Sequence, residues 1–185
     1  MPTVAIVGGG PAGLSAALFT AKNELDTVLF DTDDTWMHSA HLFNYLGIES
    51  RDGTQFLEDA RDQVDSFGAD RHQGEEVTNL ATTDEGFTVE TDSSDYDADY
   101  LVLATGATRE LAEELGCAVT DEDVVDVDVT METSVDDVYA TGAMVRAEEW
   151  QAIISAGDGA AAALNILTKE RGEHFHDFDT PEDAE

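Results

Sequence analysis

The chain has 185 residues, of which 42% are hydrophobic, and its 42 acidic and 8 basic residues give it a net charge of −34. This length fits one domain with a real hydrophobic core, and the hydrophobic fraction argues against the disorder that so large a charge often accompanies. The charge also argues against nucleic acids and anionic membranes as partners, because their phosphates would be repelled.

An acidic surface with only two lysines, Lys22 and Lys169, is typical of a protein kept soluble in concentrated salt, where screening cancels self-repulsion. We therefore expect a halophile's cytosolic protein that loses structure at low salt. The first apolar strand begins at residue 3 and no apolar run approaches membrane-spanning length, so we expect no signal peptide and a cytoplasmic location. Cys117 is the only cysteine, which excludes an internal disulfide and a C-x-x-C redox pair.

The chain opens with a buried strand (residues 3–7), a glycine-rich turn and a helix. The turn has the spacing G-x-G-x-x-G: Gly8 permits the tight turn, Gly10 lets backbone amides approach a pyrophosphate, and Gly13 lets helix and strand pack closely. Pro11 suits the first helical turn, whose positive dipole end would hold the diphosphate. The alternative is a bare tight turn, since such turns require glycine on steric grounds alone.

A second apolar strand (residues 27–30) is followed by Asp31, 23 residues after Gly8. A carboxylate at this strand tip accepts hydrogen bonds from the two hydroxyls of an adenosine ribose and repels a 2′-phosphate, which disfavours NADP. The alternative is that Asp31 is one more acid in an acidic chain.

Further along, a polar loop covers residues 31–39, and a helix with apolar residues at helical spacing runs from Gly53 to a stop at Gly68. The pattern then predicts short strands joined by polar turns at 76–80, 87–91 and 96–100, and a buried strand at 101–106 that ends in glycine. It further predicts a short helix near 111–115, a half-exposed strand at 124–129, a strand at 138–142 that runs into a glycine, and a small-residue helix at 151–167.

Three of the predicted strands run into glycines, through Val7, Ala104 and Ala140. Ligands of doubly wound sheets bind outside the carboxyl ends of the strands, where glycine lets backbone approach a long cofactor. A nucleotide alone needs only the first glycine turn, so we expect a ligand that extends along the sheet edge.

Several further motifs follow this turn in a fixed order: Asn44-Tyr45-Leu46-Gly47, Glu76-Val77, Ala104-Thr105-Gly106-Ala107, Thr133-Ser134-Val135 with Val138-Tyr139-Ala140-Thr141-Gly142, and Gln151-Ala152 with Ala156-Gly157-Asp158-Gly159. In this order the chain resembles the FAD-binding domain of low-molecular-weight thioredoxin reductases, from residue 3 to about 168.

The resemblance implies FAD as the cofactor and a homodimer as the assembly. It implies phosphates over Gly10, Pro11 and Ala12, the ribose on Asp31, the adenine at the backbone of Val77, the middle of the cofactor beside Asn44, Thr105, Gly106, Gly142 and Ala143, and the flavin pyrimidine at the helix that starts at Gln151 and Ala152. A helix start stabilises the negative charge of reduced flavin near N1 and the C2 carbonyl.

The departures from the family fall on the flavin side. Only 25 residues separate Ala107 from Thr133, so the NADPH domain inserted there in the family is missing, together with its C-x-x-C pair. Ala143 replaces an aspartate expected on the ribityl chain, and Trp150 replaces an arginine. Residues 36–39 occupy a shorter connection in place of a Gly-Gly-Gln loop. The chain is therefore not a thioredoxin reductase in the usual sense.

Other side chains leave alternatives open. His38 and His41 lie in the loop expected nearest the flavin and could donate to it or act as general acids, or simply face solvent. His174 and His176 could bind a metal, or be incidental in an acidic tail. Cys117 could form a mixed disulfide or be a buried small hydrophobe, and Trp150 could stack on the ring or fill space.

We therefore expect one Rossmann-like α/β domain over residues 1–169, with a parallel sheet, flanking helices and a small antiparallel three-stranded meander. Residues 170–185 are predicted to be a disordered acidic tail. The leading function is an FAD flavoprotein passing electrons between an external donor, NAD(P)H or a partner redox protein, and an acceptor. The alternatives are a non-catalytic FAD, NAD or ADP module and a subunit that completes a reductase with a partner chain. No metal site is predicted.

Overall fold

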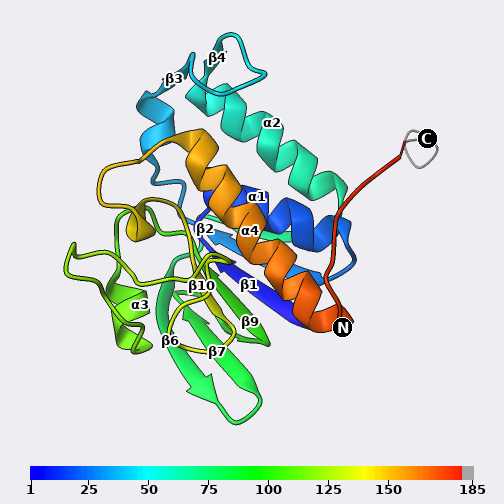
Figure 1. The fold of residues 1–185 in the computed structure, drawn as a ribbon, viewed down its shortest axis with the longest axis vertical. Helices are drawn as coiled ribbons and strands as arrows, with labels where there is room; N and C mark the ends of the chain where they lie inside the picture. The colour runs from blue at the N-terminus through cyan, green and yellow to red at the C-terminus, as the bar shows by residue number, and fades with distance from the viewer. Residues whose placement is uncertain (181–185) are drawn as a thin grey trace.

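A five-stranded parallel sheet forms the middle layer of the computed structural model, which describes residues 1–180 (Figure 1). The strand order is β10-β9-β1-β2-β5, and every neighbouring pair is parallel. The predicted parallel α/β sheet is confirmed. Its strands are β1 (Thr3–Val7), β2 (Asp26–Asp31), β5 (Asp70–Gln73), β9 (Tyr100–Leu103) and β10 (Val138–Ala140).

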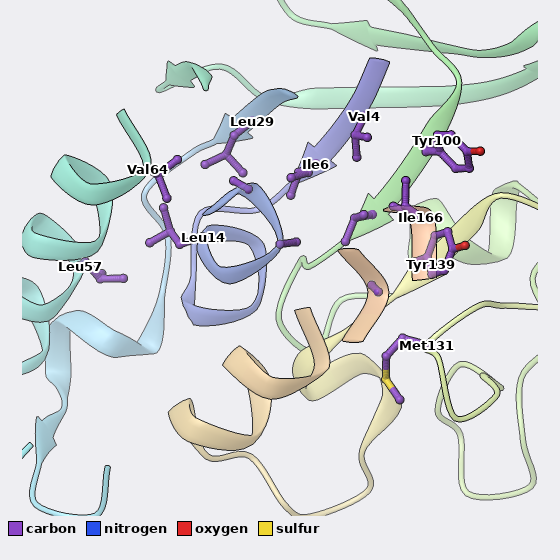
Figure 2. Packing of buried hydrophobic residues seen from close by; sticks show 14 of the residues in the cluster. Val4, Ile6, Leu14, Leu29, Leu57, Val64, Tyr100, Met131, Tyr139 and Ile166 are labelled. Carbon is purple, nitrogen blue, oxygen red and sulfur yellow. The ribbon is translucent and has the colours of Figure 1, made fainter. Parts of the chain in front are cut away.

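Three helices cover one face of this sheet: α1 (Pro11–Lys22), α2 (Gly53–Ser66) and α4 (Ala152–Arg171). Successive strand residues point to opposite faces, so Val4 and Ile6 of β1 pack toward the helices. They meet Leu14 of α1, Leu57 of α2 and Ile166 of α4 in one buried cluster (Figure 2). Leu57 and Val64, two of the apolar residues at helical spacing in the helix predicted after Asp52, are buried in this cluster, whereas Phe67 at the end of α2 is 44% exposed.

An antiparallel meander covers the opposite face, to which Ala5 and Val7 of β1 point. Leu80, Phe87 and Val89 from the meander pack with these two residues in a second buried cluster. The predicted three-stranded meander is confirmed, with strands β6 (Val77–Thr83), β7 (Gly86–Thr91) and β8 (Asp95–Ala98).

Short elements complete the described chain. The loop after β2 holds a 3-10 helix and leads into a two-stranded antiparallel pair, whose second strand runs directly into α2. Asp52 starts α2, because its carboxylate accepts the backbone N–H groups of Thr54 and Gln55 at 3.0 and 3.2 Å. The short elements are η1 (Trp36–Ser39), β3 (His41–Leu42), β4 (Arg51–Asp52), α3 (Glu110–Glu114) and η2 (Gly142–Val145).

The prediction of a strand at residues 124–129 is wrong. The segment makes only an isolated bridge, between Val119 and Val125, and Val129 is 91% exposed. Its backbone hydrogen bonds go to separate segments, since the N–H of Val125 donates to the carbonyl of Met144 in η2 and that of Asp126 to the carbonyl of Ala118. Alternating valines and aspartates therefore fail to make a strand here, because the backbone of the segment bonds to a neighbouring loop and to η2 and forms no ladder with a strand of the described chain.

The sequence reading also missed β5, whose four residues are all polar or charged. This strand lies at the edge of the sheet and pairs only with β2 among the described strands. An edge strand with little buried surface needs no apolar alternation, so hydrophobic patterning cannot reveal it.

At the C-terminal end, α4 continues through Arg171, past the point at which the tail was predicted to begin. Lys22 of α1 pairs with Asp177 and Asp179 at 2.6 Å each. The last part of the predicted tail, residues 181–185, lies outside the described residues. Within residues 1–180, no helix combines the length and the apolar character needed to cross a bilayer.

Candidate functional site

The turn between β1 and α1 depends on close backbone approaches that only glycine allows. Gly8 has φ +112°, and a Cβ on it would lie 2.2 Å from the carbonyl oxygen of Ala104. A Cβ on Gly13 would lie 1.8 Å from the carbonyl oxygen of Gly8. Both glycines therefore have steric roles in joining β1, α1 and β9.

The backbone at the start of α1 is not crowded by neighbouring atoms, in contrast to the backbone at Gly8 and Gly13. A Cβ on Gly10 would meet only the Thr35 hydroxyl, at 3.8 Å, and no side chain caps the helix. Pro11 occupies the first turn, and the first turn of a helix leaves backbone N–H groups without intrahelical partners. These amides and the helix dipole form an anion-binding geometry, at the place that the glycine pattern predicts for the diphosphate.

The three glycine-bearing strand ends lie side by side. β10, β9 and β1 are neighbours, and their registers align Ala140 with Leu103 and Leu103 with Val7. The following turns, which carry the predicted residues Thr105, Gly106 and Gly142, therefore share the carboxyl edge with Gly8. A Cβ on Gly142 would lie 3.4 Å from the Cβ of Ala12, so η2 reaches the start of α1.

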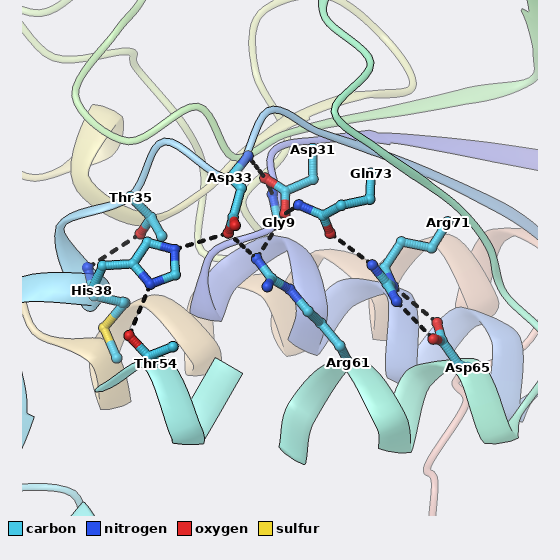
Figure 3. Close-up of polar contacts among 11 residues, drawn as sticks. Gly9, Asp31, Asp33, Thr35, His38, Thr54, Arg61, Asp65, Arg71 and Gln73 are labelled. Atoms are coloured by element: carbon cyan, nitrogen blue, oxygen red, sulfur yellow. Dashed lines mark hydrogen bonds and ion pairs between the residues drawn. The ribbon is translucent and has the colours of Figure 1, made fainter. Parts of the chain in front are cut away.

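Asp31 ends β2 beside this turn and is 5% exposed (Figure 3). One carboxylate oxygen, Oδ1, accepts the backbone N–H groups of Gly9 and Asp33 at 3.2 and 2.9 Å. The other, Oδ2, accepts Nη2 of Arg61 at 3.1 Å and Nε2 of Gln73 at 3.2 Å. Asp31, the residue predicted to bind the ribose, therefore lies at the end of β2 beside the glycine turn. It accepts hydrogen bonds from four donors of its own chain.

The sequence analysis did not predict that Arg61 and Gln73 contact Asp31. Arg61 also pairs with Asp33, and its buried Nε has no hydrogen-bond partner among the described residues. Neither residue belongs to a motif, since one lies on the polar side of α2 and the other in the unpredicted strand β5. The only available signal was an arginine in a chain with few basic residues.

His38 belongs to the same hydrogen-bond network as Arg61 and Asp31. Its Nε2 lies 2.9 Å from Oδ1 of Asp33, and its Nδ1 lies 2.9 Å from the Thr54 hydroxyl (Figure 3). Burial alone would raise the pKa of Asp33, but hydrogen bonds from Arg61 and His38 outweigh it and lower that pKa. His41, the second candidate, contacts the hydroxyl of Ser50 at 2.9 Å.

Two residues predicted on the flavin side meet although 107 positions separate them. The amide of Asn44 donates to Oε1 of Gln151 over 2.7 Å. Gln151 directly precedes α4, whose first residue is the predicted Ala152, and no side chain caps this helix start either. This hydrogen bond joins the loop at residues 43–50 to the start of α4.

Trp150 packs against Trp36, with ring centroids 5.4 Å apart, and its indole N–H donates to the carbonyl of Arg146 at 2.8 Å. The two rings are 48% and 62% exposed. This ring contact joins η1 to the residues that precede α4. Ala143, which was predicted beside the middle of the cofactor, lies within η2.

Val77, the residue predicted at the adenine, begins β6 and is 9% exposed. A polar group lies nearby: Nδ1 of His72 is 2.8 Å from Glu75, which also accepts the Tyr96 hydroxyl at 3.0 Å. Burial would lower the pKa of His72, but the carboxylates of Asp70 and Glu75 outweigh it and raise that pKa.

The remaining candidates lie apart from this edge. Cys117 is buried, with Sγ 3.4 Å from the Thr133 hydroxyl, and burial raises the pKa of its thiol. This environment fits the prediction that Cys117 is a small, buried hydrophobic side chain. His176 stacks on Phe178. Among residues 1–180 there is no group of three or more His, Cys, Asp or Glu side chains that could hold a metal ion.

Comparison with known proteins identifies the family of the chain. The family model for pyridine nucleotide-disulphide oxidoreductases matches residues 2–112 and 72–159. Thioredoxin reductase from Listeria monocytogenes is 31% identical over 122 residues, which cover 64% of this chain and 37% of that protein. A ferredoxin–NADP reductase from Levilactobacillus brevis is 26% identical over 110 residues, covering 56% of this chain and 33% of that protein.

Among solved structures, a thioredoxin reductase from Gloeobacter violaceus superposes with a TM-score of 0.86 at 21% identity, over 97% of this chain and 99% of that chain. This likeness concerns the fold. The aligned part of the chain spans just over a third of the length of the Listeria enzyme. The chain therefore belongs to the pyridine nucleotide-disulphide oxidoreductase family, and its sequence and fold are similar to those of thioredoxin reductases.

Proposed function

We propose that this chain binds FAD along the carboxyl edge of its sheet and passes electrons between an external donor and an acceptor. The observation that carries the proposal is the uncapped start of α1 beside three glycine-bearing strand ends. The backbone at Gly10 is open, whereas the backbone around Gly8 and Gly13 is closed by neighbouring carbonyls. This arrangement fits a diphosphate held by amides with a longer group beyond it.

Each part of the site would bind one part of the cofactor. The amides at the start of α1 would hold the diphosphate, Asp31 would accept the ribose hydroxyls, and the backbone at Val77 would meet the adenine. Asn44 and Gln151 would orient the flavin beside the start of α4, where the helix dipole favours negative charge. Bound FAD would supply the redox chemistry, which the protein groups tune through hydrogen bonds and charge.

NAD(P)H or a partner redox protein is the proposed donor. The chain lacks a C-x-x-C pair and the domain that the family inserts between Ala107 and Thr133. The donor would therefore reach the cofactor from solution or on another chain.

The second candidate is a non-catalytic module that holds FAD, NAD or ADP, or a subunit that completes a reductase. Ala143 favours it, because a carboxylate expected on the ribityl chain is absent while the adenosine side keeps its glycines and Asp31.

Absorbance of the purified protein separates these functions. Flavin bands that NAD(P)H bleaches support the electron-transfer role, whereas flavin bands that persist indicate a carrier dependent on a partner chain. A colourless protein that releases ADP or NAD on denaturation supports the binding module. Asp31→Ala should weaken cofactor binding by about 1–3 kcal/mol through lost charge-assisted hydrogen bonds. Asp84→Ala, in the exposed turn between β6 and β7, is the matched control, and equal retention in both variants would remove Asp31 from the site.

A further inference from the structure

The Asp31 carboxylate has no acceptor position left for a sugar. A carboxylate offers about four lone-pair positions, and four donors of the chain already occupy them: Gly9, Asp33, Arg61 and Gln73. A ribose hydroxyl can bond to Asp31 only by replacing one of these donors. We propose that the Gln73 side-chain amide is an internal competitor that holds the place of the ribose hydroxyls and leaves when the nucleotide binds. This inference rests on the proposed nucleotide site.

Gln73 is the donor that can leave. The Gly9 and Asp33 donors are backbone N–H groups, fixed by the β1–α1 turn and the loop after β2. The Arg61 side chain is only 13% exposed and bridges two carboxylates, Asp31 and Asp33. Gln73 is neutral, exposed and makes a single bond to Oδ2 of Asp31. Replacing a neutral amide by a hydroxyl exchanges one donor for another without moving a charge.

The sheet places Gln73 for this role. Asp31 and Gln73 are direct partners in the parallel register of β2 and β5, so their side chains emerge on the same face. Arg71 holds the other end of the amide, since its Nη1 donates to Oε1 of Gln73 at 2.7 Å. Asp65 of α2 in turn holds Arg71 with two bonds of 2.9 and 2.7 Å (Figure 3).

This chain of contacts fixes the amide against Asp31 before any ligand arrives. The Arg71 bond orients the Gln73 oxygen away from Asp31 and its NH₂ group toward it, so the amide is preorganised as a donor. Nucleotide binding then breaks one hydrogen bond of the protein for each one that the ribose forms on that oxygen. The affinity of the site for a nucleotide is therefore lower than it would be without the Gln73 hydrogen bond.

The test is an ADP titration by calorimetry of the full chain freed of bound cofactor. ADP carries the ribose hydroxyls and a diphosphate, and 2′,3′-dideoxy-ADP lacks the hydroxyls. Gln73→Ala should bind ADP about 3- to 10-fold more tightly than the unsubstituted protein, because a net hydrogen bond no longer has to be broken. The variant should bind 2′,3′-dideoxy-ADP with unchanged affinity. Gln73→Val, which suits an edge strand, should give the same result and guards against poor folding of the alanine variant.

Gln55→Ala is the matched control, because the amide of Gln55 also donates to carboxylates, those of Glu58 and Asp59, outside this network. Its ADP affinity should equal that of the unsubstituted protein. If the unsubstituted protein binds ADP and both Gln73 variants bind it equally or more weakly, the competitor role is overturned while the nucleotide site stands. If no variant binds ADP or FAD, the proposed function itself fails.

Discussion

Arg146 and Asp158 form an ion pair that ties the segment after η2 to the middle of α4. Nη2 of Arg146 lies 2.5 Å from Oδ1 of Asp158, and Nε lies 3.3 Å from Oδ2. The Asp158 side chain is only 7% exposed, whereas that of Arg146 is 35% exposed. Arg146 is the one cation among residues 1–180 that pairs with this buried carboxylate, and the pair also holds the segment leading toward Gln151.

Arg146→Met should lower the free energy of unfolding by about 3 kcal/mol, because it leaves a buried carboxylate unpaired. The expected loss lies at the low end for buried pairs, since water can reach the site once the arginine is gone. Urea unfolding of Arg109→Met provides the control: Arg109 pairs with Asp123, which is 76% exposed, and its loss should cost less than about 1 kcal/mol. Equal costs for the two variants would contradict a structural role for the Arg146 pair.

The contact between α1 and α4 predicts different outcomes for two glycines of α4. A Cβ on Gly159 would lie 2.0 Å from the carbonyl oxygen of Ala12, whereas a Cβ on Gly157 would meet nothing within 4 Å. Gly159→Ala should destabilise the protein by about 1–3 kcal/mol through overpacking. Gly157→Ala should stabilise it by about 0.5–1 kcal/mol through helix propensity.

Thermal unfolding of both glycine variants checks this prediction. The Gly159 variant should also bind FAD more weakly, since the displaced backbone belongs to the first turn of α1. A neutral or stabilising effect of Gly159→Ala would show that the two helices can separate without cost.

His72 makes stability depend on pH near neutrality. Its folded-state pKa is raised, so the protonated ring stabilises the fold, and this contribution is complete below the ordinary histidine pKa of about 6.5. The contribution is lost as pH rises through the raised folded-state pKa. We therefore expect the free energy of unfolding to fall as pH rises from 6 to 8, above the range in which Asp and Glu titrate.

Urea unfolding at the two pH values measures this fall. His72→Gln should reduce it, because glutamine carries no titrating charge between Asp70 and Glu75. His41→Gln is the control, since His41 contacts a serine hydroxyl. An unchanged pH dependence in His72→Gln would assign the effect to another group.

Salt should stabilise the fold. Within residues 1–180, seven of the eight basic side chains form ion pairs, and most of the acidic side chains described there have no basic partner. The remaining repulsion falls when ions screen it, and the Debye length drops from about 10 Å at 0.1 M to about 3 Å at 1 M salt. The melting temperature should therefore rise from low to molar KCl. A melting temperature that does not change would contradict the expected adaptation to salt.

Much of the fold could be read from residue patterns, for reasons that differ among the elements. β1 was predicted from its short apolar run, α1 from the glycine turn and Pro11 that precede it, and α2 from apolar residues at helical spacing. β5 was missed because Asp70, Arg71, His72 and Gln73 lie at a sheet edge with little to bury. Residues 124–129 have a strand's alternation, but a strand also needs a partner edge, and no pattern within the segment can report whether one is near.

Local sequence by itself determined the glycine turn, the acidic tip of β2 and the family to which the chain belongs, because these depend on backbone freedom and on spacing along a few residues. Only the tertiary structure decided that Arg61 and Gln73 complete the bonds of Asp31, and that Asn44 meets Gln151. These contacts arise from the register of β2 with β5 and from the packing of α2 and α4 on one sheet, which bring together side chains that no local spacing connects.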